Sequence, residues 1–67
     1  MSVARITEIS STSSKSFDEA VRKGIERASK TLRNIRGAWV KEQQVIVEDG
    51  KLTKFKVNLL VTFELED

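Results

Sequence analysis

The fold is indicated most clearly by residues 48–65, which read EDGKLTKFKVNLLVTFEL. Asp49-Gly50 in this stretch is typical of a tight β-hairpin turn, because both residues tolerate the positive φ that such a turn requires. Apolar side chains then occupy every second position: Phe55, Val57, Leu59, Val61, Phe63 and Leu65. Since alternate side chains of a strand share a face, the pattern predicts a strand over Leu52–Glu66 with one buried face.

An amphipathic helix is predicted upstream, from about Phe17 to Arg33. Ser16, followed three residues later by Glu19, forms the capping-box pattern that opens a helix. Gly24 lies on the apolar stripe and indicates close approach of the helix to a sheet, and Gly37 suits a stop after the helix. The stripe itself recurs at spacings of three and four: Phe17, Ala20, Val21, Gly24, Ile25, Ala28, Leu32 and Ile35.

Two further strands complete a β-α-β-β order. Val3–Ile9 carries a weak strand pattern, and Ala38–Val47 leads into the hairpin. This order allows a right-handed crossover in which the last strand lies between the other two and antiparallel to both. We therefore expect an α+β fold in a single domain over residues 1–67, with a three-stranded antiparallel sheet packed on one helix.

Pairing Glu48 with Lys51 across the turn gives an expected register for the hairpin. Counting outward places three pairs on the sheet face away from the helix: Trp39 with Leu60, Lys41 with Asn58, and Gln43 with Lys56. The same count puts Glu42 and Gln44 on the helix side, where a carboxylate needs either a bulge or a charged partner. The sequence leaves both alternatives open.

The size of the chain predicts self-association. A domain of 67 residues buries only about 60% of the surface of its unfolded chain, so its core is small. The chain has neither Cys nor His, which excludes a disulfide and a zinc site as supports for that core. One helix also leaves the second face of the sheet bare, and neighbouring copies can bury it.

Composition argues against several functions. Without Cys or His the chain lacks a Ser-His-Asp triad, a Cys-His pair and a zinc site, so we expect no enzymatic activity. A net charge of +2 permits anionic ligands without demanding nucleic acid. Glu19 and Glu26 interrupt the basic surface formed by Arg22, Lys23, Arg27, Lys30, Arg33 and Arg36. We find no signal sequence or bilayer-spanning stretch, and expect a cytoplasmic protein that binds neither membrane nor nucleic acid.

Several segments follow one another in an order found in a known family. They are the serine-rich residues 10–15, the helix, Thr31–Asn34, Val40–Gln43 and the closing Val57–Leu65. Over its whole length the chain thereby resembles the dodecins. Dodecins are β-α-β-β subunits that assemble twelve at a time into a hollow shell, and characterised members bind flavins in pairs and are viewed as flavin stores. The resemblance implies a homododecamer that binds a flavin, riboflavin or FMN.

The resemblance also implies where a flavin would lie. In flavin-binding dodecins a tryptophan directly after the helix stacks on the flavin ring, and a glutamine in the last strand hydrogen-bonds the ring edge. A gapless alignment puts Gly37 at the tryptophan position and Lys56 at the glutamine position. Trp39 lies two residues later on the same strand face and could offer its indole plane, while Lys56 could attract a phosphate or polarise a ring carbonyl. The candidate cofactor-binding residues are Trp39, Gln43 and Lys56.

Two alternatives stay open. Trp39 could instead pack against Leu60 and a neighbouring subunit, as aromatic residues often do at interfaces. The shell could also be structural, or could hold Ca²⁺ or Mg²⁺ where carboxylates gather at a symmetry axis. The carboxylates available for this are Glu48, Asp49, Glu64, Glu66 and Asp67.

Overall fold

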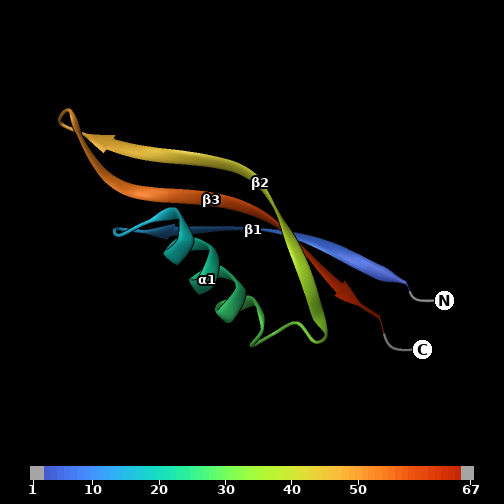
Figure 1. Cartoon of the computed structure of the whole chain (residues 1–67). Coiled ribbons are helices and arrows are strands. Elements are labelled where there is room, and N and C mark those ends of the chain that lie inside the picture. The colour runs from blue at the N-terminus through green and yellow to red at the C-terminus, as the bar shows by residue number, and fades with distance from the viewer. Residues whose placement is uncertain (1–2, 66–67) are drawn as a thin grey trace.

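The computed structural model describes residues 3–65 and has the expected β-α-β-β order (Figure 1). The elements are β1 (Ala4–Ser13), α1 (Phe17–Ala28), β2 (Ile35–Glu48) and β3 (Lys51–Glu64). The strands form one sheet in the order β1-β3-β2, with β3 antiparallel to both neighbours. The predicted α+β fold and the central place of the last strand are confirmed, although the predicted strand end at Glu66 lies outside the described residues.

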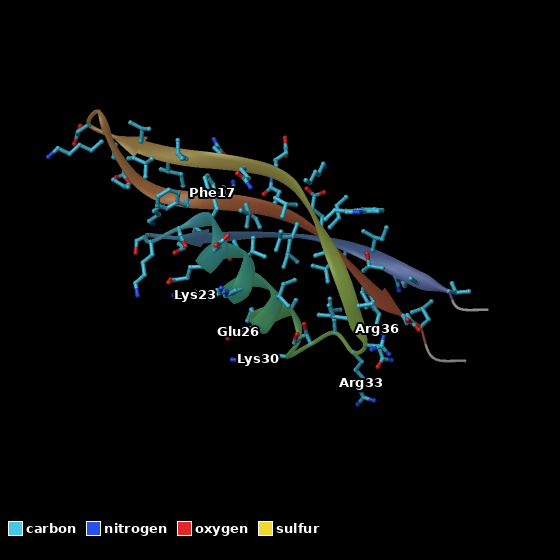
Figure 2. All side chains as sticks on the ribbon, viewed as in Figure 1. Phe17, Lys23, Glu26, Lys30, Arg33 and Arg36 are labelled. Carbon is cyan, nitrogen blue, oxygen red and sulfur yellow. The ribbon has the colours of Figure 1, made fainter. Side chains whose placement is uncertain are left out.

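The core lies between α1 and the helix side of β3. Val57, Leu59 and Val61 are fully buried, as their alternation predicts, and Ala20 of α1 packs against them. Burying each such aliphatic side chain of β3 stabilises the fold by about 1.5–3 kcal/mol. At the start of the helix the rings of Phe17 and Phe55 meet edge to face, with 5.1 Å between their centroids. Charged residues of α1 project outward (Figure 2).

One half of the predicted capping box opens α1. The Ser16 side chain accepts a hydrogen bond from the backbone N–H of Glu19 at 3.0 Å. The Glu19 carboxylate does not return to Ser16. It accepts instead from Ser13 Oγ at 3.1 Å and pairs with Lys23 Nζ at 3.0 Å. The hydrogen bond from Lys23 lowers the pKa of Glu19 below its ordinary value, because it favours the ionised form.

The helix ends earlier than predicted, at Ala28 rather than near Arg33. The next backbone N–H groups turn back onto the last turn of the helix, as in the 2.8 Å bond from Leu32 N to the Ala28 carbonyl. Leu32 still packs against the core, so the apolar spacing continues although the helix has stopped. The chain turns at Asn34, whose φ is 61°. Gly37 lies inside β2, and the prediction that it stops the helix is wrong.

The first strand is longer than its apolar pattern predicts. Serine and threonine residues extend β1 from Ile9 to Ser13, where Ser13 pairs with Phe55. Ladder hydrogen bonds come from the main chain, so these residues pair without an apolar signal. Ser11 also confirms the predicted close approach of the helix. A Cβ added at Gly24 would lie 3.1 Å from Ser11 Cβ and 3.2 Å from Leu59 Cδ1.

Three register shifts interrupt the β2–β3 ladder, and two of them, both bulges, lie between the turn and Trp39; the third lies between Ile35 and Gly37. Glu48 lies opposite Lys51 and Trp39 opposite Leu60, as predicted. The predicted pairs of Lys41 with Asn58 and of Gln43 with Lys56 are wrong, because β3 gains Thr53 as an extra residue and β2 gains Lys41. The pairs formed instead are Glu42 with Asn58, Gln43 with Val57, and Gln44 with Lys56. The sequence left open whether a bulge or a charged partner accommodates Glu42. The structure shows a bulge, which moves Glu42 off the helix side of the sheet.

Candidate functional site

The face of the sheet opposite α1 is the candidate site, and we call it the open face. Since strand partners share a face, it carries the residues that alternate with the buried side chains of β3. Figure 1 shows α1 on one side of the sheet only. The residues that pair across this face are Ile6, Glu8, Ser10 and Thr12 of β1, Lys56, Asn58, Leu60 and Thr62 of β3, and Gly37, Trp39, Glu42 and Gln44 of β2.

Trp39 dominates the apolar end of the open face. It lies on β2 opposite Leu60, and 64% of its surface is exposed. Gly37 lies two positions away, opposite Thr62, and a Cβ added there would meet nothing within 4 Å. Ile6 adds a more than half-exposed apolar side chain from β1. In one chain the indole therefore borders open space on an apolar surface, an arrangement that suits stacking by a flat ring.

An ion pair borders this apolar end. Lys41 Nζ lies 3.4 Å from Glu8 Oε2, and both side chains are about half exposed. Lys41 is the extra residue of the β2 bulge, and Glu8 lies opposite Leu60 on the other side of β3. The bulge thus lets a side chain of β2 reach one of β1 across the central strand. Exposed pairs of this kind contribute only about 0–1 kcal/mol to stability.

A polar hollow occupies the middle of the hairpin. Its volume is about 320 Å³, and it is lined by Glu42, Gln43, Gln44, Lys56 and Asn58. Asn58 Nδ2 donates a hydrogen bond to Glu42 Oε1 at 3.0 Å, which fixes the carboxylate. Lys56 forms no ion pair within residues 3–65. The hollow thus offers a cation, a carboxylate and three amides to the polar groups of a ligand.

The structure brings together only part of the predicted site. Lys56 and Gln43 both line the polar hollow, although Gln43 lies opposite Val57 and so belongs by register to the helix side. Trp39 lies apart. Its partner Leu60 is four residues from Lys56 along β3, which corresponds to about 13 Å at the rise of a β-strand.

Sequence reasoning missed Glu42, Gln44 and Asn58, which line the hollow with Lys56. An uninterrupted register put Glu42 and Gln44 on the helix side of the sheet. The signal that could have found them was the carboxylate of Glu42 itself. A charge on the covered face is costly, and a bulge between the turn and Trp39 removes that cost.

Neither a metal cluster nor a membrane helix is found in the described part of the chain. Within residues 3–65, no three Asp or Glu side chains gather closely enough to hold a metal ion. Glu64, one of the predicted cation ligands, pairs with Arg36 at 3.2 Å, and Glu66 and Asp67 lie outside the described residues. The one helix of this region is neither long nor apolar enough to span a bilayer.

The fold and the open face define a class of small β-α-β-β proteins whose sheet is covered on one side only. Comparison with protein families identifies the class. The family model Dodecin matches residues 3–66, and the chain belongs to the dodecin family. No curated protein sequence matches it.

Solved structures agree with this assignment. Dodecin from Streptomyces davaonensis is 36% identical with a TM-score of 0.93, over 98% of this chain and 97% of that one. Dodecin from Streptomyces coelicolor is 36% identical with a TM-score of 0.92, over 98% and 94%. Calcium dodecin from Mycobacterium tuberculosis, a calcium-chelating antigen with a novel calcium-binding site, is 31% identical with a TM-score of 0.83, over 96% and 91%.

Proposed function

We propose that this protein is a non-enzymatic shell of twelve identical subunits that binds or stores a flavin in the cytoplasm. The observation that carries the proposal is Trp39, a residue that is 64% exposed on a bare sheet face and borders open space at Gly37. Burying the exposed apolar surface of this tryptophan would be favourable, and a contacting group is required to bury it. A planar ligand and a neighbouring subunit can both supply one, and a shell supplies them together.

The bare face supports assembly. Five large apolar side chains in residues 3–65 are at least half exposed. Ile6 and Trp39 lie on the open face, Val47 and Leu52 lie near the hairpin turn, and Val3 precedes β1. Since burial of a fully exposed side chain contributes about 1.5–3 kcal/mol, covering the exposed half of each of these contributes roughly 1 kcal/mol or somewhat more. Within residues 3–65, α1 is the only layer beside the sheet, and it lies on the side away from the open face. Closed symmetric assembly removes these side chains from water, and the number twelve follows the dodecin resemblance.

The spacing along β3 favours FMN over riboflavin. A ring stacked on Trp39 within one subunit leaves Lys56 about 13 Å away along the strand. This separation suits the end of a ligand's side chain better than the ring edge. Lys56 can bind a terminal phosphate, and Glu42 can accept hydrogen bonds from hydroxyl groups of the same side chain.

Titration of FMN and riboflavin into the purified protein tests this function. Flavin emission and Trp39 emission are followed together, and Trp39 is the only tryptophan in the chain. Saturable quenching of both signals, with tighter binding of FMN, is the expected result. If neither flavin quenches Trp39 at protein concentrations well above micromolar, the flavin proposal fails.

The second candidate is a structural or divalent-cation-binding shell that has lost flavin binding. It is favoured by the similar protein from Mycobacterium tuberculosis, which is described as a calcium dodecin. Glu48 and Asp49 at the hairpin turn are exposed and could meet their copies at a symmetry axis. An intact assembly whose melting temperature rises with Ca²⁺ or Mg²⁺, and not with flavin, would favour this candidate.

A further inference from the structure

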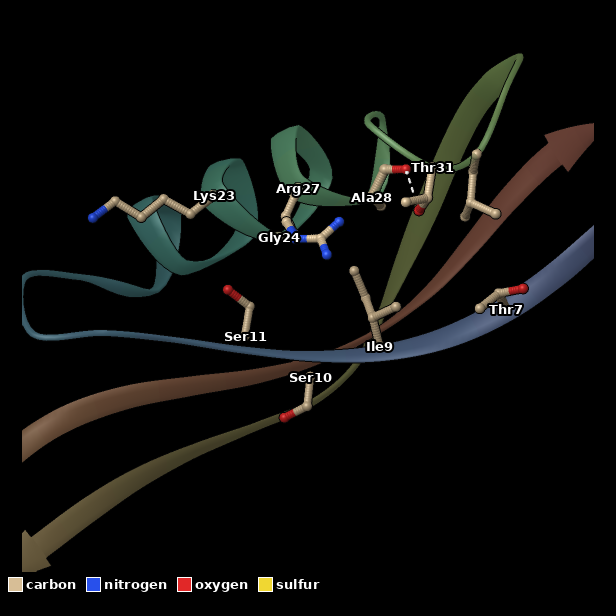
Figure 3. Close-up of a pocket in the computed structure, with 10 residues that line it drawn as sticks. Thr7, Ile9, Ser10, Ser11, Lys23, Gly24, Arg27, Ala28 and Thr31 are labelled. Atoms are coloured by element: carbon tan, nitrogen blue, oxygen red, sulfur yellow. Dashed lines mark hydrogen bonds between the residues drawn. The ribbon is translucent and has the colours of Figure 1, made fainter.

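A groove separate from the open face lies on the other side of the sheet, between α1 and β1 (Figure 3). Its volume is about 410 Å³, within the range of about 300–1,000 Å³ typical of small-molecule sites. The residues that line it are Thr7, Ile9, Ser10, Ser11, Lys23, Gly24, Arg27, Ala28, Thr31 and Leu32; the side chain of Ser10 points away from the helix, toward the open face (Figure 3).

Small residues of the helix border the groove. Gly24 lets α1 approach Ser11 and Leu59 closely, and Ala28, which is also buried, presents only a methyl group to the groove. Ile9 from β1 and Leu32 from the connection after α1 form apolar walls that continue into the core. An aliphatic chain can pack along these apolar walls and so remove its own surface from water.

The charge around the groove has one sign. Lys23 and Arg27 line it, and no carboxylate does. The charge of Lys23 is partly neutralised by its 3.0 Å pair with Glu19. Arg27 forms no ion pair with any residue from 3 to 65, and Figure 3 shows its guanidinium group beside the gap between helix and strand. A guanidinium group can bind a carboxylate through two parallel hydrogen bonds.

We propose that this groove is a second binding site, for a small aliphatic carboxylate of the fatty-acid type. The chain of the ligand lies along Ile9, Ala28 and Leu32, and its carboxylate pairs with Arg27. Lys23 adds positive charge to the lining of the same groove, and the hydroxyl group of Ser11 lines it as well. The site needs neither Trp39 nor a flavin, because it lies on the opposite side of the sheet.

Titration of octanoate into the assembled protein tests the proposal, with the methyl NMR signals of Ile9, Ala28 and Leu32 as the readout. Octanoate should shift these signals saturably, whereas octan-1-ol and acetate, which each lack one part of the ligand, should bind at least about tenfold more weakly. Arg27→Gln should weaken octanoate binding by about tenfold, the usual effect of losing a hydrogen-bonded charge. Arg27→Lys should bind octanoate more tightly than Arg27→Gln does, because lysine keeps the positive charge but not the two parallel hydrogen bonds.

Arg22→Gln is the matched control, because Arg22 is an exposed arginine of the same helix that does not line the groove. It should bind octanoate like the unchanged protein. Equal binding of octan-1-ol and octanoate, equal losses in the two arginine variants, or unmoved methyl signals would overturn the proposal. Arg27-dependent sedimentation with phosphatidylglycerol vesicles, without octanoate binding, would assign the groove to a membrane surface and also contradict it.

Discussion

Gln44 lies opposite Lys56 across the β2–β3 ladder, one residue away from the pairing that an uninterrupted hairpin would give. Thr53 on β3 shifts the register near the turn, and Lys41 on β2 restores it before Trp39. Between these two bulges, even and odd positions of β2 exchange faces. As a result Glu42 lies on the open face rather than on the helix side. There it accepts a hydrogen bond from Asn58 and lines the polar hollow with Lys56.

Lys56→Gln should weaken FMN binding by about tenfold and change riboflavin binding by less than about twofold. The reason is that only FMN carries the phosphate that Lys56 would bind, and a hydrogen bond to a charged group contributes about 1.5–3 kcal/mol. Parallel fluorescence titrations measure both constants. Lys54→Gln is the control, since Lys54 lies on the same face of β3 outside the hollow. Equal losses for both flavins would place Lys56 at the ring edge instead.

Trp39→Ala should lower flavin affinity by about tenfold or more, and Trp39→Phe should retain most of it. Aromatic stacking adds about 0.5–1.5 kcal/mol to the effect of burying the ring area, and phenylalanine keeps an aromatic plane. Because both variants lose the tryptophan signal, flavin emission is the readout. A Trp39→Ala variant that binds flavin normally but no longer assembles would show that Trp39 is a packing residue between subunits.

Gly24→Ala should destabilise the protein by about 1 kcal/mol, although alanine favours helix by a similar amount. The new methyl group would meet Ser11 and the buried Leu59 at 3.1 and 3.2 Å, and overpacking of this kind costs about 1–3 kcal/mol. Gly37→Ala is the matched control, because its Cβ would meet nothing within 4 Å. Urea unfolding of the two variants makes the comparison. A more stable Gly24→Ala variant would mean that the helix and β1 can separate freely.

The ion pair of Glu19 with Lys23 should make stability depend on pH in the acid range. The folded state lowers the pKa of Glu19 from its ordinary value of 4.5, mainly through the Lys23 hydrogen bond. The stabilisation is therefore present above the unfolded pKa and is lost as pH falls through the folded pKa. Melting temperatures below pH 5 should fall less steeply in Glu19→Gln than in the unchanged protein. Glu26→Gln, on the same helix without an ion pair in the described residues, should keep the original slope.

The sequence predicted those features of the fold that depend on local patterns. The Asp49-Gly50 turn and the alternation from Phe55 to Phe63 are local signals, and both appear as predicted. The helix end was missed because Leu32 keeps the helical spacing while packing from the following connection. The extension of β1 to Ser13 was missed because residues 10–13 pair with β3 through their main chain, and their serine and threonine side chains show no apolar alternation that would indicate a strand.

The candidate site was predicted in part for the same reason. Trp39 lies on the open face as expected, since the two bulges cancel before it, whereas Gln43 lies between them and changes face. Bulges depend on the fit of two strands and not on either strand alone. The roles of Trp39, Gln43 and Lys56 in binding a flavin stay predictions.

Native mass spectrometry of the protein with and without FMN tests the central claim most directly, because one spectrum gives both the assembly and its bound ligand. Twelve copies of the 7.6 kDa chain have a mass of about 91 kDa. The proposal predicts this mass, increased by whole numbers of FMN when the ligand is present. A monomer or dimer would contradict the shell, and an assembly that gains no mass from FMN would contradict its role as a flavin-binding protein.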